Sequence, residues 1–537
     1  MKFFLTKKAV LGVWDGKKNK DQKMKNWVFV VISGLCLTPG FAQPGKISGH
    51  VYVDENSNGI YDKGETPLPN VSLSNGIDVV QTNERGEYEI PLLDDAVIFV
   101  IKPSGYIPGL TENNISNFFA YHKPKGSPKY KYQGIPKTVL SDPLDFAMCP
   151  NPGEDTVKVA LLGDTQIEII DDVYYVAKLV GEQLINEKVD FVVPLGDLVF
   201  DDLDLFDPLK MVLGKIGAPV YYVYGNHDRN YEATRLQYRD ETFKAHFGPS
   251  YYAFNYGSVA FLVLNTVFPE NGTRKFEGKI DKNQLRFIEN YVKTLSFDTP
   301  IHFFMHVPLE EVSNLDSLFL LFKDHANVSA YAGHTHTQYF KYFGKKDGWP
   351  HNQPMTELVA GAVCGSWWMG EKDMYGVPNA MMGDGTPKGY WILDISGLNR
   401  NCTYKVSGNL PDKQMHIWTP HKFLNETAFL DNNDIIVNIY AGNDSTKVEL
   451  KIEGKSWVPM QKVKAPDPYY TRLIKLLESG NNSAENTPYY RERFPLSSHI
   501  WKMKIPVELM PGVYSVKIRA RNNNGLNAQA HTLLFVD

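Results

Sequence analysis

Five short apolar runs between residues 155 and 340 each end in side chains that can bind a metal ion. The runs are Val157–Leu162, Phe191–Leu195, Val220–Tyr224, Ile301–Met305 and Val328–Ala332. Helix-like segments lie between them, one with apolar residues at 3–4 spacing from Val173 to Leu184 and one beginning near Asp281. Strands alternating with helices predict an α/β fold with a mostly parallel sheet, in which ligands gather at the carboxyl ends of the strands.

The residues that follow these runs form a consistent set of candidate metal ligands. They are Asp164, Gln166, Asp197, Asn226, His306, His334 and His336, with His227 beside Asn226. Each has an ordinary explanation on its own, because Gly, Asn and Asp are common turn residues and a lone histidine is often part of a core. Five such strand ends in one region favour a shared site. Carboxylate, imidazole and amide ligands suit Mn²⁺, Fe or Zn²⁺.

The order of these motifs resembles the calcineurin-like metallophosphoesterases. The matching segments are Gly163-Asp-Thr-Gln166, Gly196-Asp197, Gly225-Asn-His-Asp228, His306 and Gly333-His-Thr-His336. The resemblance implies a four-layer α/β/β/α sandwich with two divalent ions. It implies that Asp164, Gln166, Asp197 and His336 hold one ion. It also implies that Asp197, as a bridge, holds the other ion with Asn226, His306 and His334, and that His227 faces the phosphoryl group.

This resemblance implies hydrolysis of phosphoric esters by a hydroxide that bridges the two ions. Two ions about 3.5–4 Å apart lower the pKa of a shared water and stabilise an in-line displacement at phosphorus. One ligand departs from the family pattern, since the family usually has histidine where this chain has Gln166. The sequence does not distinguish monoester from diester substrates.

Three residues near the motifs are candidate substrate contacts. Arg229 follows the central motif, and its guanidinium can pair with a phosphate oxygen. Trp367 and Trp368 follow a predicted strand at Glu357–Ala360, where they either pack in the core or stack on a sugar, base or acyl chain.

Two β-rich segments flank residues 151–400, the predicted catalytic domain. Residues 46–150 and 401–537 each predict a β-sandwich from short alternating strands, and the second contains a helical insertion at Pro468–Leu477 and a tyrosine-corner turn at Leu509–Tyr514. The loop after the first strand has the calcium-loop pattern, with candidate ligands Asp54, Asn56, Asn58, Ile60, Asp62 and Glu65. A polar hairpin loop is the alternative.

The amino terminus predicts export. Residues 1–45 contain an apolar run, Trp27–Leu37, and small residues that fit signal-peptidase cleavage after Ala42. Met24 starts a segment of ordinary signal length. Leu35 before Cys36 argues against a lipid anchor. The flanking modules also resemble those of exported bacterial phosphoesterases, so we expect a periplasmic or secreted protein.

The composition argues against some classes of binding partner. The chain of 537 residues has a net charge of −5, which argues against a nucleic-acid or anionic-membrane surface. Three cysteines follow the predicted cleavage site, too few and too scattered for a disulfide framework. Two alternatives to an enzyme remain at this point: a cell-surface binding protein built on an inactive phosphoesterase fold, and a calcium-dependent adhesin.

Overall fold

The computed structural model describes residues 45–153, 156–270, 273–420, 433–479 and 494–536. The predicted signal segment, with Cys36, therefore falls outside the described residues, apart from Gly45 at the start of the first strand. Within the ranges that are described, no helix has both the length and the apolar character needed to cross a bilayer.

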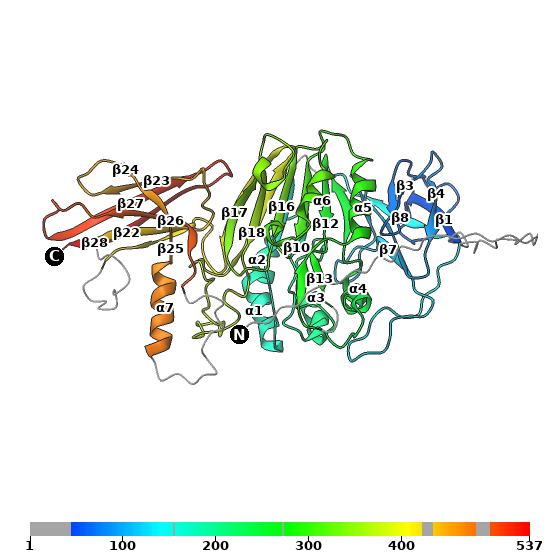
Figure 1. Ribbon diagram of the computed structural model, residues 1–537, viewed down its shortest axis with the longest axis horizontal. Helices are drawn as coiled ribbons and strands as arrows, with labels where there is room; N and C mark the ends of the chain where they lie inside the picture. The colour runs from blue at the N-terminus through cyan, green and yellow to red at the C-terminus, as the bar shows by residue number, and fades with distance from the viewer. Residues whose placement is uncertain (1–44, 154–155, 271–272, 421–432, 480–493, 537) are drawn as a thin grey trace, which may run out of the picture. The chain divides into compact units, whose positions relative to one another are not determined.

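Two sheets form the centre of the protein (Figure 1). The first has the strand order β10 (Phe191–Pro194), β9 (Val157–Leu162), β19 (Gly389–Ser396) and β20 (Asn399–Val406). The second has the order β11 (Tyr252–Tyr256), β12 (Val259–Val263), β15 (Ile301–Met305), β16 (Val328–Ala332), β18 (Met355–Ala360) and β17 (Gln338–Phe343). A two-stranded ribbon, β13 (Val267–Pro269) with β14 (Phe276–Gly278), lies outside these sheets.

The strand directions refine the prediction of a mostly parallel sheet. β12, β15, β16 and β18 run parallel, as do β9 and β10, whereas β11, β17, β19 and β20 pair antiparallel to their neighbours. The predicted strand Val220–Tyr224 forms only one bridge, between Val220 and Val192, although Tyr221 and Val223 also donate backbone hydrogen bonds to β10. It is an extended segment beside the first sheet.

The two central sheets share a core, and helices cover their other faces. Alternate residues of β9 point in opposite directions: Val159 and Leu161 enter the larger core, while Ala160 and Leu162 enter a second core with residues of the α1–α3 region. Phe191 of β10 contacts Phe254 and Phe261 of the second sheet at ring-centroid distances of 5.3 and 5.2 Å. The mixed α/β architecture predicted from the sequence is confirmed.

The helical segments that the sequence predicts, at 173–184, from Asp281 and at 468–477, are present, and other short helices accompany them. The helices are α1 (Ile170–Val176), a π-helical segment (Ala177–Gly181), α2 (Glu182–Leu184), α3 (Phe206–Gly214), α4 (Glu241–Phe247), α5 (Lys282–Val292), α6 (Leu315–Leu320) and α7 (Pro468–Ser479). Asp281 caps α5 by accepting the backbone N–H groups of Asn283 and Gln284, as its position predicts.

The amino-terminal module contains two four-stranded sheets and contacts the central region. The sheets are β4 (Glu87–Leu92), β1 (Gly45–Val53), β8 (Phe146–Pro150), β6 (Tyr106–Pro108), and β3 (Val79–Gln81), β2 (Ser72–Ser74), β5 (Ala96–Val100), β7 (Phe119–His122). Lys102 donates to the carbonyl oxygen of Asn255 at 2.7 Å, and buried Lys123 pairs with Glu241 of α4 at 3.0 Å. These bonds hold the module against the second central sheet and α4.

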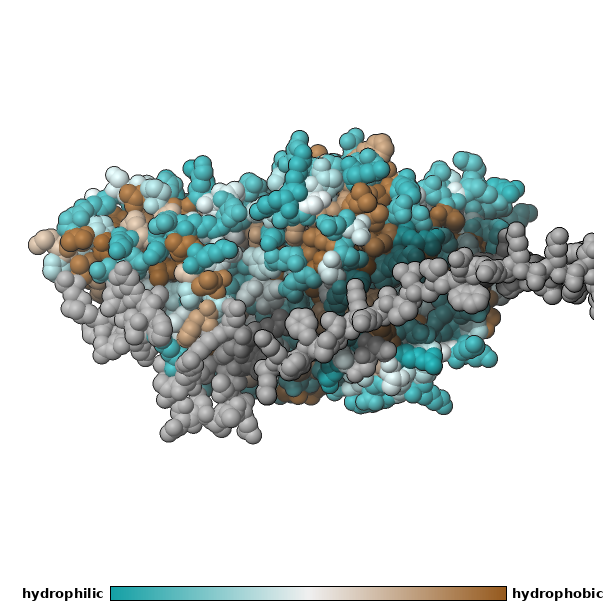
Figure 2. Space-filling view, viewed as in Figure 1, coloured by the Kyte–Doolittle hydropathy of each residue, from teal (hydrophilic) through white to brown (hydrophobic). Residues whose placement is uncertain are grey.

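The carboxy-terminal module also has two four-stranded sheets. They are β21 (Met415–Trp418), β22 (Asp434–Ile439), β26 (Ser497–Lys504), β25 (Gln461–Ala465), and β24 (Val458–Pro459), β23 (Lys447–Ile452), β27 (Gly512–Arg521), β28 (Asn527–Val536). The Tyr514 hydroxyl donates to the Met510 carbonyl at 2.8 Å, which confirms the predicted tyrosine corner. Figure 2 shows apolar residues among polar ones over β27 and β28, where Val513, Leu533 and Phe535 are exposed.

Candidate metal centre

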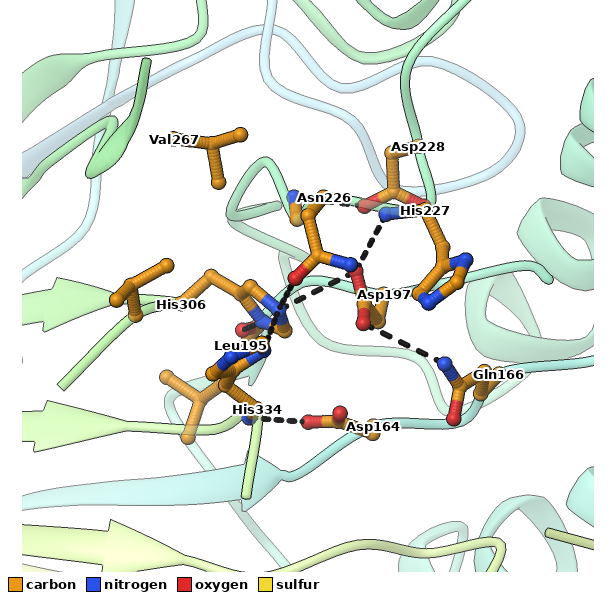
Figure 3. Close-up of polar contacts among 12 residues, drawn as sticks. Asp164, Gln166, Leu195, Asp197, Asn226, His227, Asp228, Val267, His306 and His334 are labelled. Atoms are coloured by element: carbon orange, nitrogen blue, oxygen red, sulfur yellow. Dashed lines mark hydrogen bonds and ion pairs between the residues drawn. The ribbon is translucent and has the colours of Figure 1, made fainter. Parts of the chain in front are cut away.

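All seven candidate ligands meet where the strands of the two central sheets end. Figure 3 labels all of them except His336. Asp164 follows β9, Asp197 follows β10, His306 follows β15, and His334 and His336 follow β16. Asn226 comes from the extended segment beside β10. Because parallel strands deliver their carboxyl ends to one edge of a sheet, residues up to 172 positions apart in the chain meet here.

One group of acceptors converges around His306. One ligand atom each from Asp197, His306 and His334 lies within 4.8 Å of the others, and all three residues are buried. His306 Nε2 is 3.0 Å from Asn226 Oδ1, 3.2 Å from Asp197 Oδ1 and 3.2 Å from His334 Nδ1. Lone pairs this close repel one another unless a proton or a cation lies between them. The donor set therefore fits a metal ion.

The other predicted group surrounds Asp164. Its Oδ2 is 3.2 Å from His336 Nε2 but out of hydrogen-bond geometry, so this buried oxygen has no hydrogen bond. Gln166 Oε1 is buried without a hydrogen bond as well, while its Nε2 lies 3.4 Å from Asp197 Oδ2. Buried acceptors left without partners cost about 1–3 kcal/mol each, and a cation between them removes that cost. This group also fits a metal ion.

Backbone carbonyls fix which imidazole nitrogen faces the site. His306 Nδ1 lies 2.9 Å from the Leu195 carbonyl, and His336 Nδ1 lies 2.8 Å from the Gly365 carbonyl. Each Nδ1–H therefore donates to a carbonyl, so Nε2 is the nitrogen of both rings that faces the carboxylates. Neither carbonyl was identified from the sequence, since no side-chain pattern marks a carbonyl oxygen.

The electrostatics of the site favour positive charge. Burial disfavours the ionised form of Asp197, but the neighbouring His306 and His227 outweigh burial and hold its pKa well below the usual range. Burial also disfavours protonated His306, yet Asp197 raises the pKa of His306 to about 9. A pocket that keeps its carboxylate ionised and attracts a proton onto its imidazole is one that stabilises a cation.

The ligand loops have unusual backbone conformations. Gln166, Asp197, His334 and His336 have φ values of 37°, 46°, 76° and 52°, in the left-handed region that non-glycine residues seldom adopt. Such conformations cost about 1–3 kcal/mol each and persist where surrounding contacts enforce them. The glycines of the motifs have a related role: a Cβ on Gly225 would lie 1.9 Å from the Asp197 backbone nitrogen. The loops must touch for the ligands to converge.

His227 is the member of its motif that reaches solvent. Its side chain is 22% exposed, whereas Asn226 and Asp228 are buried. Its Nδ1 lies 2.8 Å from Asp201 Oδ1, and its ring stacks on Phe200 with centroids 4.6 Å apart. Burial lowers its pKa, but Asp197 and Asp201 together raise it. The ring is thus fixed by Asp201, a partner that the sequence did not reveal.

Asp228 holds two ligand loops together. Its carboxylate accepts backbone N–H groups from Leu198 at 2.8 Å, Val199 at 3.3 Å and Gly225 at 2.8 Å. The first two follow Asp197, and the third precedes Asn226. Burial and the nearby Asp197 raise the pKa of Asp228 to about 7. Asp228 therefore sets the distance between the loops that carry Asp197 and Asn226.

Arg229 is buried just after the central motif. The residue is 2% exposed. Its guanidinium donates to the carbonyls of Asn226 at 2.6 Å, Lys275 at 3.1 Å and Arg274 at 3.0 Å, and to the Tyr231 hydroxyl at 2.7 Å. These bonds already use donors that the predicted phosphate contact would need, so the structure gives that contact no support. Arg229 anchors the loop that carries Asn226.

We expect Arg229→Met to lower the free energy of unfolding by about 2–4 kcal/mol, because it leaves several buried carbonyls without donors. Urea denaturation measures this loss. Arg235→Met, which alters an exposed arginine in the same region, is the matched control and should change stability by less than about 0.5 kcal/mol. An increase in KM with unchanged stability would instead support the phosphate contact.

The two tryptophans lie beside the metal-binding groups. The Trp367 ring is tilted over His336 with centroids 4.6 Å apart. Trp368 donates its indole N–H to the carbonyl of Thr165 at 3.0 Å and packs on Tyr175 at 5.6 Å. Both side chains are half-buried. They therefore support the loops that carry Asp164, Gln166 and His336. Their contact with a substrate stays a prediction.

A buried polar network joins the carboxy-terminal module to the His336 loop. Asp384 Oδ2 accepts the backbone N–H of Gln338, two residues after His336, at 2.6 Å. His499 of β26 lies 3.3 Å from the same oxygen and 2.7 Å from Asn438 Oδ1. Burial raises the pKa of Asp384, but His499 and the backbone donors outweigh it and lower the pKa. The module thus holds one end of a ligand loop.

We expect His499→Leu to lower the free energy of unfolding by about 3–5 kcal/mol, because it leaves the buried Asp384 charge without its partner. Thermal or denaturant unfolding of the full chain measures the change. His531→Leu, which alters an exposed histidine on β28, is the control. Equal stability of the two variants would show that the network does not hold the module in place.

The predicted calcium loop follows β1, and its residues form hydrogen bonds with one another. Asp54 accepts the N–H groups of Asn58 at 3.1 Å and Gly59 at 2.9 Å, and Asp62 Oδ2 accepts from the amides of Asn56 and Asn58, both at 2.8 Å. Gly59 has a φ of 72°, as the sharp turn at position six requires. These bonds are compatible with either a calcium loop or a polar hairpin loop, so calcium stays a prediction.

Comparison with protein-family models gives three matches along the chain. Residues 157–338 match the calcineurin-like phosphoesterase model. Residues 55–142 match the model for the N-terminal part of calcineurin-like phosphoesterases, and residues 357–527 match the model for their C-terminal part. The C-terminal match begins within β18, so it includes strands of both central sheets.

Solved structures give more distant similarities. A dimetal phosphatase from Danio rerio is 15% identical, with 46% of this chain and 95% of that chain covered and a TM-score of 0.33. Purple acid phosphatase PPD1 from yellow lupin seeds is 13% identical, with 64% of this chain and 67% of that chain covered and a TM-score of 0.35. No curated protein gives a significant match. On the three family-model matches, which cover the amino-terminal, central and carboxy-terminal parts, the chain belongs to the calcineurin-like phosphoesterases.

Proposed function

We propose that this protein hydrolyses phosphoric esters at a centre of two divalent ions, Mn²⁺, Fe or Zn²⁺. The observation that carries the proposal is the convergence of Asn226 Oδ1, Asp197 Oδ1 and His334 Nδ1 on His306 Nε2 at 3.0–3.2 Å. The family supports metal-dependent hydrolysis of phosphate esters in general. The donor types exclude a site specialised for Ca²⁺, which takes oxygen ligands.

The residues divide into two sets that share Asp197. Asp164, Gln166, Asp197 and His336 would hold one ion, and Asp197, Asn226, His306 and His334 would hold the other. Asp197 suits a bridge, since Oδ1 faces His306 at 3.2 Å and Oδ2 faces Gln166 at 3.4 Å. Gln166 offers a neutral amide oxygen, so we expect the first ion to be held less tightly than the second.

When bound, the ions supply a shared water of lowered pKa as the nucleophile and neutralise charge on the phosphoryl group. His227 holds the proton for the leaving oxygen. Its Nδ1–H is directed at Asp201, so Nε2 is the nitrogen available to the ester. Asn226 and Asp197 would hold the ions against which the phosphoryl group is positioned. Asp201 also pairs with Arg274, which fixes the carboxylate that orients His227.

Turnover of p-nitrophenyl phosphate and bis-p-nitrophenyl phosphate by the purified full chain tests the proposal and separates monoesterase from diesterase activity. We expect turnover that a chelator removes and that added Mn²⁺ or Zn²⁺ restores. A well-folded protein that hydrolyses neither ester with any divalent ion would contradict the proposal. A binding protein would then be the remaining interpretation of this fold.

We also propose that the protein is exported, on the basis of the signal-like residues 1–45. Amino-terminal sequencing of the protein from its native cell tests this. The expected mature chain begins at Gln43, and an uncleaved chain recovered from the cytosol would contradict it.

A further inference from the structure

Five large apolar side chains are exposed near the metal-binding group of Asp164, Gln166 and His336, which we call the first metal-binding group. Ile169, Ile170 and Tyr174 come from the start of α1, and Met374 and Tyr375 come from the loop after Trp368. Met374 is 88% exposed, Ile170 62% and Tyr375 61%. Single exposed apolar residues are common on proteins, but several from two separate segments form a patch. We call these five residues the apolar rim.

The two segments of the apolar rim are joined to each other. The Tyr174 hydroxyl donates to the Tyr375 carbonyl at 3.4 Å. Next to this bond, Tyr175 packs against Trp368 at 5.6 Å, and the Lys372 ammonium lies 5.5 Å from the centre of the Tyr175 ring. These contacts place the two segments of the rim next to each other.

The apolar rim also begins at the metal-binding residues. Ile169 is three positions after Gln166, so the two Cα atoms are at most about 11 Å apart. On the other segment, Trp368 donates to the carbonyl of Thr165, which lies between Asp164 and Gln166. Both segments thus leave the first metal-binding group and carry apolar side chains from it out to the surface.

The chemistry of the apolar rim suits an aliphatic chain. Ile169, Ile170 and Met374 present flexible hydrocarbon or thioether surface and no hydrogen-bond donor. A nucleobase or sugar placed on them would lose its hydrogen bonds to water without replacement. Charged residues of both signs, Glu168, Asp171, Lys178 and Lys372, lie within a few positions of the patch residues along the chain. Polar residues commonly border apolar ligand sites.

We propose that the substrates are amphiphilic phosphoric esters whose phosphate enters the metal centre while the alkyl or acyl chain lies on the apolar rim. This inference rests on the proposed function and adds the substrate class. A buried methylene group favours binding about fourfold, and one that is half covered favours it about twofold. Six extra methylenes along the rim then raise kcat/KM by roughly 60-fold, and we take at least about tenfold as the prediction.

Ethyl and octyl esters test the proposal, each as the alkyl phosphate and as the alkyl p-nitrophenyl phosphate, below the concentration at which the octyl esters aggregate. Within the ester class that is hydrolysed, kcat/KM of the octyl ester is divided by kcat/KM of the ethyl ester. We expect a ratio of at least about ten for the natural chain, and a fall of at least about fivefold in that ratio for Met374→Glu and for Ile170→Glu. Leu320→Glu, which alters a 67% exposed leucine on α6, should leave the ratio unchanged.

The outcomes separate this inference from the proposed function. Turnover with equal octyl and ethyl rates, or a ratio that Met374→Glu leaves intact, overturns the chain site and leaves phosphoester hydrolysis standing. Failure to hydrolyse any of the four esters, together with inactivity on aryl phosphates, is instead a failure of the proposed function. If the natural protein forms dimers and Met374→Glu converts them to monomers, the rim is a contact between copies. That result would also overturn the proposed site for the alkyl chain.

Discussion

Asp197→Asn should lower kcat/KM for phosphate esters by at least about 10³-fold. Asp197 is shared by both predicted ligand sets, and the two ions contribute several kcal/mol of charge stabilisation in the transition state, where about 1.4 kcal/mol corresponds to tenfold in rate. Asparagine keeps the size of the side chain and removes its charge. We therefore expect the variant to fold while its bound metal, measured by elemental analysis, falls below that of the natural chain.

Asp434→Asn is the matched control for this prediction. Asp434 is also a buried carboxylate, 4% exposed, but it lies on β22 in the carboxy-terminal module and pairs with Lys502. Its replacement should leave turnover unchanged. An Asp197→Asn protein that still hydrolyses esters in the presence of chelator would show that hydrolysis does not depend on the metal centre.

His227→Ala should lower kcat for alkyl phosphates by about 10²–10⁴-fold, because general acid catalysis contributes that much when the leaving oxygen needs a proton. The loss should be smaller with p-nitrophenyl phosphate, whose leaving group departs as a stable anion. Steady-state kinetics on both esters measure the difference. Bound metal should not change, since the His227 ring is not among the proposed ligands.

The chain contains a close match for this histidine. His246 is 23% exposed and lies 3.1 Å from Asp207, much as His227 is 22% exposed and lies 2.8 Å from Asp201. His246 is on α4, outside the group of seven ligands. His246→Ala should keep full activity on both esters. If His227→Ala lost the same factor on alkyl and aryl esters, His227 would be assigned to binding the phosphoryl group instead of to proton transfer.

The sequence predicts most of the site because metal ligands lie directly after strands. The strands are recognisable from apolar runs, and the residue types after them limit the chemistry. The seven candidates come together for this reason, even though Asp164 and His336 are 172 positions apart. The cap at Asp281 and the tyrosine corner at Tyr514 were also predictable, because each depends on residues only a few positions away.

Other features depend on contacts that no local pattern encodes. The sequence places Arg229 next to the ligands, yet the side chain is directed toward the carbonyls of Arg274 and Lys275, about 45 positions further along. The contact between His336 and the Gly365 carbonyl also joins distant segments. Val220–Tyr224 has the composition of a strand, but only one bridge forms beside β10. Tertiary packing decides each of these.

Metal titration of the chelator-treated full chain tests the central claim most directly, when elemental analysis and turnover are measured on the same samples. We predict that two Mn²⁺ or Zn²⁺ ions bind per chain and that turnover of p-nitrophenyl phosphate or bis-p-nitrophenyl phosphate appears as the second ion binds. Full turnover by a chain that holds no divalent ion would contradict the account.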